Sequence, residues 1–210
     1  FPKEGEKYPR RRFEGFTEPW EKRKLGDNAT IKGRLGWKSR KKEEYTTEGA
    51  CMIAGRHIKD GIIDWNEVDH IPKWRYEESP EIMLENGDVI FSKDGTLGNP
   101  AIIEDLQCLA TINSTMMLVR TDDTINPKYF YQVLKSNQFQ RLVYMKVSGS
   151  SIPHLFQADM KEFKYWAPQI KEQQKIGMFL HQLDSLITLY QQKLEKLENI
   201  KKAYLNEMFI

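Results

Sequence analysis

The stretch EQQKIGMFLHQLDSLITLYQQKLEKLENIKKAYLNEM, residues 172–208, decides the architecture that this sequence predicts. It contains no proline and only one glycine, Gly177. Large apolar residues recur with alternating steps of four and three, a repeat of seven that is typical of a coiled-coil helix. The apolar positions of this seam are Ile176, Leu180, Leu183, Ile187, Tyr190, Leu194, Leu197, Tyr204 and Met208, and Lys201 takes the one polar position.

A helix over 172–208 would be about 55 Å long at roughly 1.5 Å per residue, which exceeds the width of a small domain. A bare seam of this length is unfavourable in water, so the pattern predicts a partner helix, from a second recognition unit or from a second copy of the chain. Lys201 would set its register or strand number. The alternative is that the seam packs on its own domain, which is too short to cover all of it.

The preceding segment, 17–168, mixes short β-prone runs with one helix-prone run. Asn126 and Pro127 predict an N-cap and a first helical residue, followed by an apolar face that reaches Leu134 and extends to Phe139. Asp94-Gly95 predicts a tight turn between two strands. The strand-like runs are 50–53, 89–91, 101–103 and 115–119.

These patterns predict an α+β fold, in which a globular domain with a twisted mixed sheet is followed by one long coiled-coil helix. The expected divisions are a linker or arm at 1–16, the globular domain at 17–168 and the helical spacer at 169–210. The arm carries the run Arg10-Arg11-Arg12 between turn-forming residues.

Charge is distributed unevenly along the chain. The net charge is only +2. Residues 1–42 carry 14 Lys and Arg against 6 Asp and Glu, whereas residues 60–110 carry 3 against 12. This pattern excludes a protein that coats DNA uniformly, and it restricts any DNA contact to one face or groove.

The two cysteines, Cys51 and Cys108, lie in apolar contexts without metal-ligand spacing, which predicts buried free thiols in a reducing cytoplasm. No apolar run approaches the roughly 20 residues of a membrane span, so no membrane partner is expected. The chain begins Phe1-Pro2 without an initiator methionine, which suggests a piece of a longer protein.

No catalytic constellation stands out in the sequence. The histidines, at 57, 70, 154 and 181, show no zinc-type pairing, and no P-loop or GxGxxG motif is present. Asp159 and Glu162 before Lys164 weakly resemble the carboxylates of a metal-dependent nuclease, an alternative without a convincing strand pair to support it. We therefore expect no metal, no cofactor and no catalytic residue in this chain.

Polar and basic side chains form three candidate DNA-contacting clusters. Lysine and arginine neutralise phosphates, arginine also grips guanine through two hydrogen bonds, and hydroxyl groups suit phosphates or base edges. For each residue taken alone, the sequence favours a solvated surface role over DNA contact, so the prediction depends on the fold bringing all three clusters to one face. They are Arg34, Trp37, Lys38, Arg40, Lys41 and Lys42; Lys93 and Thr96; and Lys146, Ser148, Ser150, Ser151 and His154.

Three stretches, in this order, resemble the specificity subunits of type I restriction–modification systems. WEKRKLGD at 20–27 is similar to the start of their target-recognition domain, and ENGDVIFSKDGTLG at 85–98 to a central strand and turn. PQIKEQQKI at 168–176, followed by Leu183, Asp184 and Ile187, is similar to the start of their conserved helix. The ends, Phe1-Pro2-Lys3 and Met208-Phe209, resemble those of a second, C-terminal half; a natural half-length subunit is the alternative.

The resemblance implies a non-catalytic role in a bacterial or archaeal cytoplasm. Such subunits read one half of a bipartite double-stranded DNA site per domain, and they recruit modification subunits and, through the complex, restriction subunits. S-adenosylmethionine is expected in the partner methyltransferase subunit. The methylating Asn/Asp-Pro-Pro-aromatic motif is absent here, since Ala101 and Lys128 follow the two Asn-Pro pairs. The alternative function is a coiled-coil adaptor that tethers a protein and ignores DNA.

Overall fold

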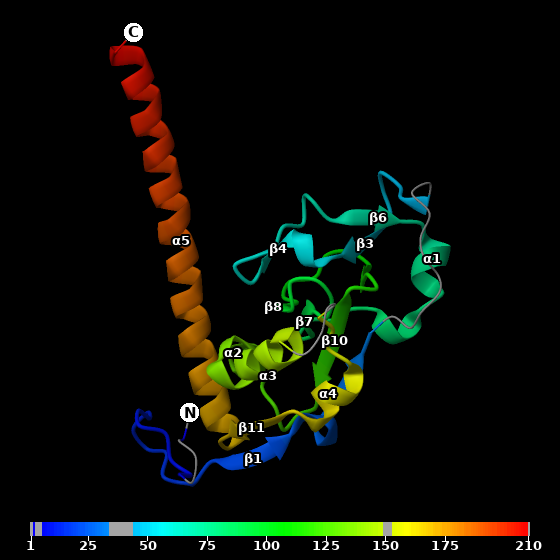
Figure 1. The fold of residues 1–210 in the computed structure, drawn as a ribbon, viewed down its shortest axis with the longest axis vertical. Helices are drawn as coiled ribbons and strands as arrows, with labels where there is room; N and C mark the ends of the chain where they lie inside the picture. The colour runs from blue at the N-terminus through cyan, green and yellow to red at the C-terminus, as the bar shows by residue number, and fades with distance from the viewer. Residues whose placement is uncertain (1, 3–5, 34–43, 149–152, 210) are drawn as a thin grey trace.

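The long C-terminal helix, α5, spans Ile170–Met208 and stands beside a separate α+β head (Figure 1). The structure is a computed structural model, and it describes all residues of the chain except 1, 3–5, 34–43, 149–152 and 210. The predicted fold class is confirmed. Only the first turns of α5 pack on the head, chiefly against α2 (Pro127–Lys135), and the rest projects away from it.

The centre of the head is an antiparallel four-stranded sheet in the order β2-β10-β7-β8. Its middle strands are apolar on both faces because core covers both sides; Val89, Ile90 and Phe91 of β7 are completely buried. The β7–β8 connection takes residues 93–97, longer than the predicted tight turn, and Gly95 within it has φ of +71°. The bounds are β2 Ala29–Lys32, β7 Val89–Ser92, β8 Gly98–Ile102 and β10 Met116–Thr121.

A smaller sheet covers one face of this centre, in the order β6-β3-β9. Here β3 runs parallel to β9 and antiparallel to β6, so this is the mixed sheet, whereas the sequence predicted a single mixed sheet for the whole domain. A short hairpin, β4–β5, lies beside it. The bounds are β3 Ala50–Ile53, β4 Ile58–Lys59, β5 Ile62–Ile63, β6 Asp69–Ile71 and β9 Ala110–Ile112.

Helices cover the opposite face of the central sheet. The side chain of Asn126 accepts a hydrogen bond from the Tyr129 amide at 3.0 Å, which confirms the predicted cap of α2. Phe139, expected to continue the face of α2, instead lies in a separate helix, α3 (Asn137–Ser148), because Ser136 is extended at the end of α2. Aromatic rings of these helices pack on the sheet, and the ring centroid of Phe139 lies 5.6 Å from that of Phe91 in the inner strand β7.

The two ends of the head meet in a two-stranded sheet, where β1 (Glu21–Lys24) pairs antiparallel with β11 (Lys164–Ala167). Because β11 leads directly into α5, this pairing fixes where the long helix starts. Shorter elements complete the head: α1 Lys73–Glu77, α4 Gln157–Glu162 and the 3-10 turns Leu25–Asp27, Gly55–His57 and Pro80–Ile82.

The buried imidazole of His57 makes the stability of the head dependent on pH. The Ala54 amide donates to Nδ1 of His57 at 3.0 Å, and burial, assisted by the neighbouring charge of Arg56, lowers the His57 pKa below its ordinary value. The unfolded chain therefore takes up this proton first as pH falls, so stability present above about pH 6.5 is lost below it. We expect the urea midpoint to fall between pH 7 and pH 5.5.

The replacement His57→Asn tests this assignment because an amide oxygen retains an acceptor for Ala54 but does not titrate. The variant should show a flatter change in urea midpoint over the same pH interval. An unchanged slope would assign the pH dependence to other groups.

Candidate functional site

Three segments from distant parts of the sequence meet at one edge of the head. The backbone of Lys93, just after β7, accepts a hydrogen bond from the amide of Leu155 at 2.9 Å, and His154 pairs with Asp94 across the same contact. Gln157 donates to the carbonyl of Gly33 at 3.4 Å. The chain that enters the predicted basic cluster, the β7–β8 connection and the segment before α4 thus lie side by side.

All six residues of the first predicted cluster, and two of the five in the third, lie outside the described part of the chain. Gly33 is the last described residue before the first cluster and Glu44 the first after it. A Cβ on Gly33 would lie 3.4 Å from Cε of Lys93, so Gly33 itself lies beside the second cluster. The residues outside the described structure, whose DNA-contacting role stays a prediction, are Arg34, Trp37, Lys38, Arg40, Lys41, Lys42, Ser150 and Ser151.

The described cations at this edge are held by carboxylates. Nζ of Lys93 lies 3.5 Å from Oδ2 of Asp94. Nζ of Lys146 in α3 lies 2.8 Å from Oδ1 of Asp159 in α4. His154 shares Asp94 with Lys93. These lysines are therefore positioned by their partners, and each phosphate contact would compete with an existing ion pair.

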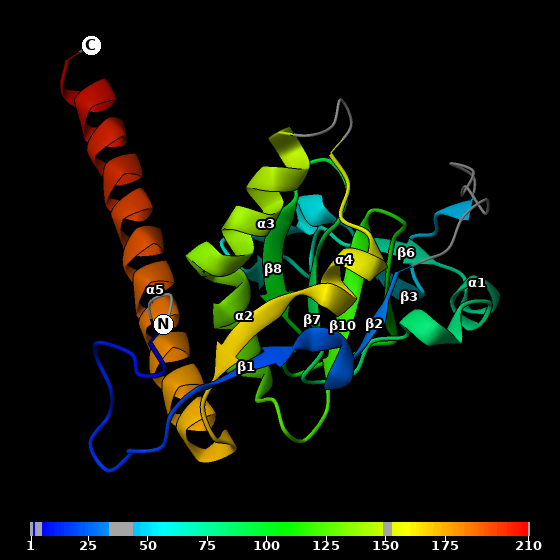
Figure 2. The same ribbon diagram turned by 60° about the horizontal axis from the view of Figure 1, so that its bottom comes forward.

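The C-terminal half of α3 projects from the head towards this edge (Figure 2). It carries Lys146 and Ser148, and Thr96 is exposed on the β7–β8 connection. Helix α3 also carries an exposed apolar group that the sequence-based prediction missed. The available signal for this helix was the run 137–148, which contains no proline or glycine. The exposed apolar residues are Tyr144, Met145 and Val147, joined by Phe156 near α4.

The carboxylates of the nuclease alternative are engaged elsewhere. Asp159 binds Lys146 and also accepts from the Phe156 amide at 2.9 Å, capping α4. Glu162 is exposed and pairs with Lys24 at 2.7 Å. Within the described ranges, no group of three His, Cys, Asp or Glu residues could hold a metal ion. The geometry gives this alternative no support.

Two buried polar side chains in the first turn of α5 attach the helix to the head. We call this attachment the mount. Glu172, only 1% exposed, accepts two hydrogen bonds from Arg12 at 2.8 and 2.7 Å. Gln173, fully buried, accepts from the Asn126 amide at 3.0 Å and donates to the carbonyls of Thr124 and Pro168 at 3.1 and 2.9 Å. These bonds join α5 to the arm, to the start of α2 and to the end of β11.

Farther along α5, a glycine and an ionic contact continue the mount. A Cβ on Gly177 would lie 2.7 Å from the Tyr129 amide nitrogen, so glycine allows α5 to touch the start of α2. Asp184 accepts from Gln132 at 2.6 Å and from Lys135 at 2.8 Å. Burial opposes protonation of Lys135, but the bond to Asp184 leaves its pKa above the ordinary value. Four turns of α5 are thereby fixed against the head.

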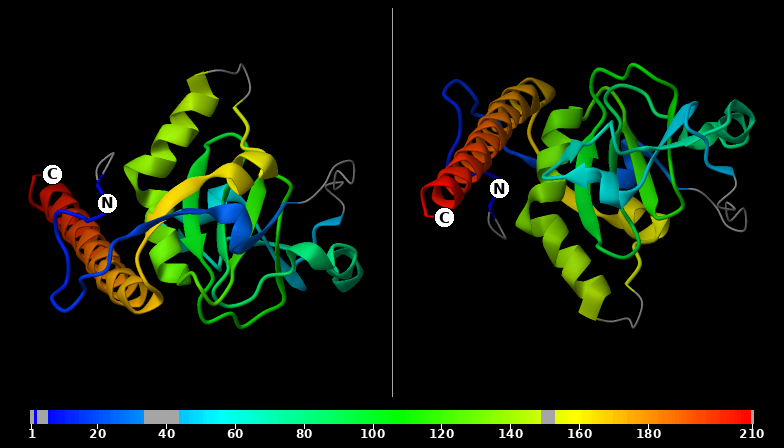
Figure 3. Two further views of the ribbon diagram at one scale, coloured as in Figure 1. Left: turned by 90° about the horizontal axis from the view of Figure 1, so that it is seen from below. Right: turned by 90° about the horizontal axis from the view of Figure 1, so that it is seen from above.

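The arm closes this mount from the other side. Residues of 6–19 run beside the base of α5 (Figure 3), where Phe13 meets Phe179 edge to face at 5.6 Å between centroids. The ammonium group of Lys175 lies 5.0 Å from the Phe13 ring centroid and 5.7 Å from that of Phe16. The predicted linker thus packs on α5 over its first turns.

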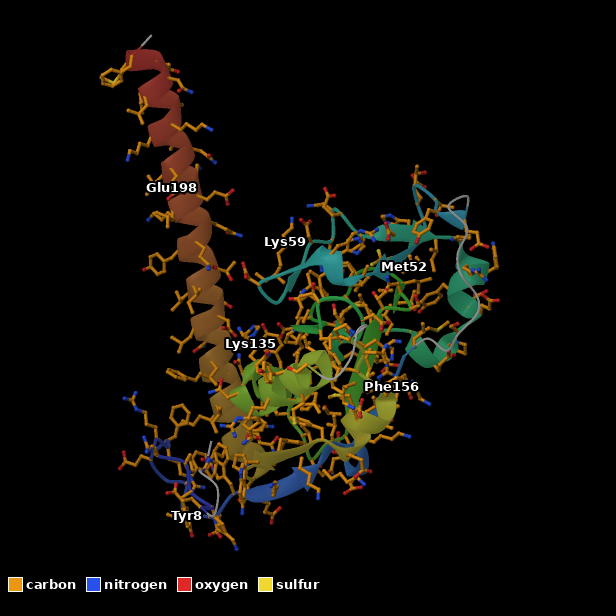
Figure 4. All side chains as sticks on the ribbon, in the orientation of Figure 1. Tyr8, Met52, Lys59, Lys135, Phe156 and Glu198 are labelled. Carbon is orange, nitrogen blue, oxygen red and sulfur yellow. The ribbon has the colours of Figure 1, made fainter. Side chains whose placement is uncertain are left out.

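The seam faces away from the head. At roughly 100° per residue, the positions that contact the head at Gln173, Gly177 and Asp184 are turned by about 100° from the centre of the seam. Ile176 packs against the core of the head and Leu180 is half-buried, so the seam begins covered. In Figure 4, the part of α5 around Glu198 stands apart from the head, surrounded only by the side chains of α5 itself. The exposed seam residues are Leu183, Ile187, Tyr190, Leu194, Leu197, Tyr204 and Met208.

Comparison with known proteins identifies the family. The type I restriction modification DNA specificity domain matches residues 17–199. The chain belongs to this family. Its relatives are specificity subunits, which are non-catalytic, and this agrees with the prediction from the sequence that the chain is not an enzyme. None of the helices in the described structure is long and apolar enough to cross a membrane.

Individual relatives agree with this assignment. The MjaVIII specificity subunit of Methanocaldococcus jannaschii is 21% identical over 91% of this chain and 45% of its own length, and the putative MjaX subunit of the same organism is 25% identical over 92% and 46%. The chain therefore spans less than half of these relatives. The S subunit structure from M. genitalium has the same fold, with a TM-score of 0.62 and 20% identity over 88% of this chain and 44% of that chain.

Proposed function

We propose that this chain reads one half of a bipartite double-stranded DNA site and directs partner subunits to it. The observation that carries the proposal is the convergence of the three segments at one edge of a head that hydrogen bonds of Gln173 and Asp184 attach to α5. The head would contact the DNA, and modification subunits would supply S-adenosylmethionine and the methylating chemistry. Restriction subunits would join through the complex, in the cytoplasm of the cell.

The dimensions of α5 suit a spacer. Its 39 residues give a length of about 58 Å, which accommodates half-sites separated by about one DNA turn, roughly 34 Å. The seam beyond Leu183 would bind the antiparallel helix of a second recognition unit or of a second copy of the chain. Because the head contacts α5 on a different side, both contacts can exist together.

Reconstitution tests the proposal. The chain is joined to a partner recognition domain and to modification subunits of a characterised system, and methylated adenines are mapped across a genome. We expect a bipartite motif in which one half changes only when this module is exchanged. An assembled complex that methylates without such a half-motif would reject DNA reading, and a folded module that binds protein but no DNA at any salt would favour the adaptor.

The replacement Lys146→Gln should weaken DNA binding evenly across sequences. Removing one phosphate contact reduces the slope of log K against log salt by about 1 and lowers affinity several-fold near physiological salt. Fluorescence anisotropy of the reconstituted complex over a salt series measures both. Lys59→Gln is the matched control, because Lys59 is equally cationic but lies on the β4–β5 hairpin, which faces α5. Equal losses in both variants would contradict the assigned face.

A further inference from the structure

The two cysteines of the chain meet in the fold. Cys51 and Cys108 are 57 positions apart in the sequence, yet their Sγ atoms lie 2.8 Å from each other. The backbone holds both in place, because β3 runs parallel to β9 with Cys51 opposite Ala110, and the Cys51 amide donates to the Leu109 carbonyl at 2.7 Å. The sequence predicted two buried thiols, but Cys108 is half-exposed.

The two thiols differ in environment in a way that assigns them different chemical roles. Cys51 is 6% exposed, and burial, together with its hydrogen bond to Cys108, raises its pKa to about 12. Cys108 is the sulfur that solvent reaches. On the other side of Cys51, Nε2 of His70 lies 3.9 Å from its Sγ, across the β3–β6 pair. An oxidant therefore reaches Cys108 first. Because its raised pKa keeps Cys51 protonated, attack by Cys51 on an oxidised Cys108 requires a base, and Nε2 of His70 is the neighbouring group that can take the proton.

We propose that Cys51 and Cys108 form a reversible oxidation site that takes a hydroperoxide as oxidant and closes to an intramolecular disulfide. The Cys108 thiolate attacks one oxygen of hydrogen peroxide, the O–O bond breaks, and the departing hydroxide takes a proton to become water. Cys51 gives its proton to His70 and attacks the sulfenic sulfur of Cys108. The S–O bond breaks and hydroxide leaves with that proton as a second water. Two thiols and one peroxide thus give one disulfide and two waters.

The disulfide would tie β3 to the segment that enters β9. It would close a long loop in the unfolded chain, which lowers the entropy of that state and stabilises the fold. For a chain of this size we expect the midpoint of thermal unfolding to rise by on the order of 10 °C on oxidation and to return on reduction with dithiothreitol. This inference is independent of the proposed DNA recognition.

The experiment treats the reduced 210-residue chain with a small excess of hydrogen peroxide and then alkylates the remaining thiols. Intact mass spectrometry should show a loss of about 2 Da with no alkylation, and peptides from a non-reducing digest should link Cys51 to Cys108. The thermal midpoint is measured on the same samples. Full alkylation of both cysteines after treatment, or sulfinic acid at Cys108 without the link, would overturn the proposal.

Single replacements separate the two roles. Cys51→Ser should let Cys108 proceed to sulfenic acid and then to higher oxides or to an intermolecular disulfide, and it should abolish the midpoint shift. Cys108→Ser should leave Cys51 reduced under the same treatment, because burial protects it. Equal oxidation of Cys51 in both the wild-type chain and Cys108→Ser would overturn the assignment of Cys108 as the first sulfur oxidised. A Cys51–Cys108 disulfide that forms without a rise in the thermal midpoint would show that the native fold does not hold the two thiols in a geometry suited to the bond.

Discussion

Replacing Leu194 with aspartate should abolish association through α5 and leave the head intact. Leu194 is exposed in the isolated chain, at the middle of the uncovered seam, and a partner helix would bury it. An unpaired carboxylate buried in such an interface costs about 3–5 kcal/mol, which corresponds to a loss of affinity of at least 100-fold. Sedimentation at tens of micromolar should show self-association of the unmodified chain and a monomer for the variant.

Gln192→Asp is the matched control for this prediction. It adds the same charge in the same turn of α5, but on the side opposite the seam, so association should persist. Both variants should melt at the temperature of the unmodified head, because the hydrogen bonds that the described structure shows between α5 and the head lie between Glu172 and Asp184. A monomeric unmodified chain, or equal losses in the two variants, would contradict a partner helix on the seam. Loss of cooperative melting in Leu194→Asp would contradict the separation of head and spacer.

Local patterns made the elements predictable from the sequence. The seven-residue repeat gave α5 almost to its ends, Asn126-Pro127 gave the start of α2, and the run 50–53 coincides with β3. A helix start and an apolar period depend on neighbours a few residues apart, which the sequence displays directly. These parts of the prediction needed no knowledge of the tertiary fold.

The pairing of distant segments was not predictable. β1 pairs with β11 across the whole head, and the parallel contact of β3 with β9 brings Cys51 to Cys108. Strand order depends on contacts between residues far apart in the sequence, and one sequence holds no direct record of them. The single mixed sheet of the prediction was therefore wrong in arrangement, while the α+β class was right.

The candidate site divides in the same way. The sequence located basic and hydroxyl residues, but it could not show that Lys146 pairs with Asp159 or that Asp94 holds both Lys93 and His154. It also placed the polar pair Glu172 and Gln173 in a family-like motif without indicating that both are buried. In the structure they fasten the helix, since each satisfies its polar atoms with distant partners.

The replacement Gly177→Ala should destabilise the chain, although alanine is the better helix former by about 1 kcal/mol. The new Cβ would lie 2.7 Å from the Tyr129 amide nitrogen and 2.9 Å from Oδ1 of Asn126, and the first of these is backbone at the start of α2. Separating α5 from α2 would strain the bonds of Gln173. We expect a net loss of about 2 kcal/mol in the free energy of unfolding, measured by urea titration with tryptophan fluorescence.

The sign of this change decides whether the mount is rigid. Gln174→Ala, in the same turn but exposed, is the control and should have an effect within about 0.5 kcal/mol. If Gly177→Ala stabilised the chain as it would a free helix, α5 would not touch α2, and the head would turn on its spacer. A protein that reads a bipartite site could not fix the distance between the half-sites if its head turned on the spacer. A spacer of fixed geometry therefore also requires that Gly177→Ala lowers the stability of the chain.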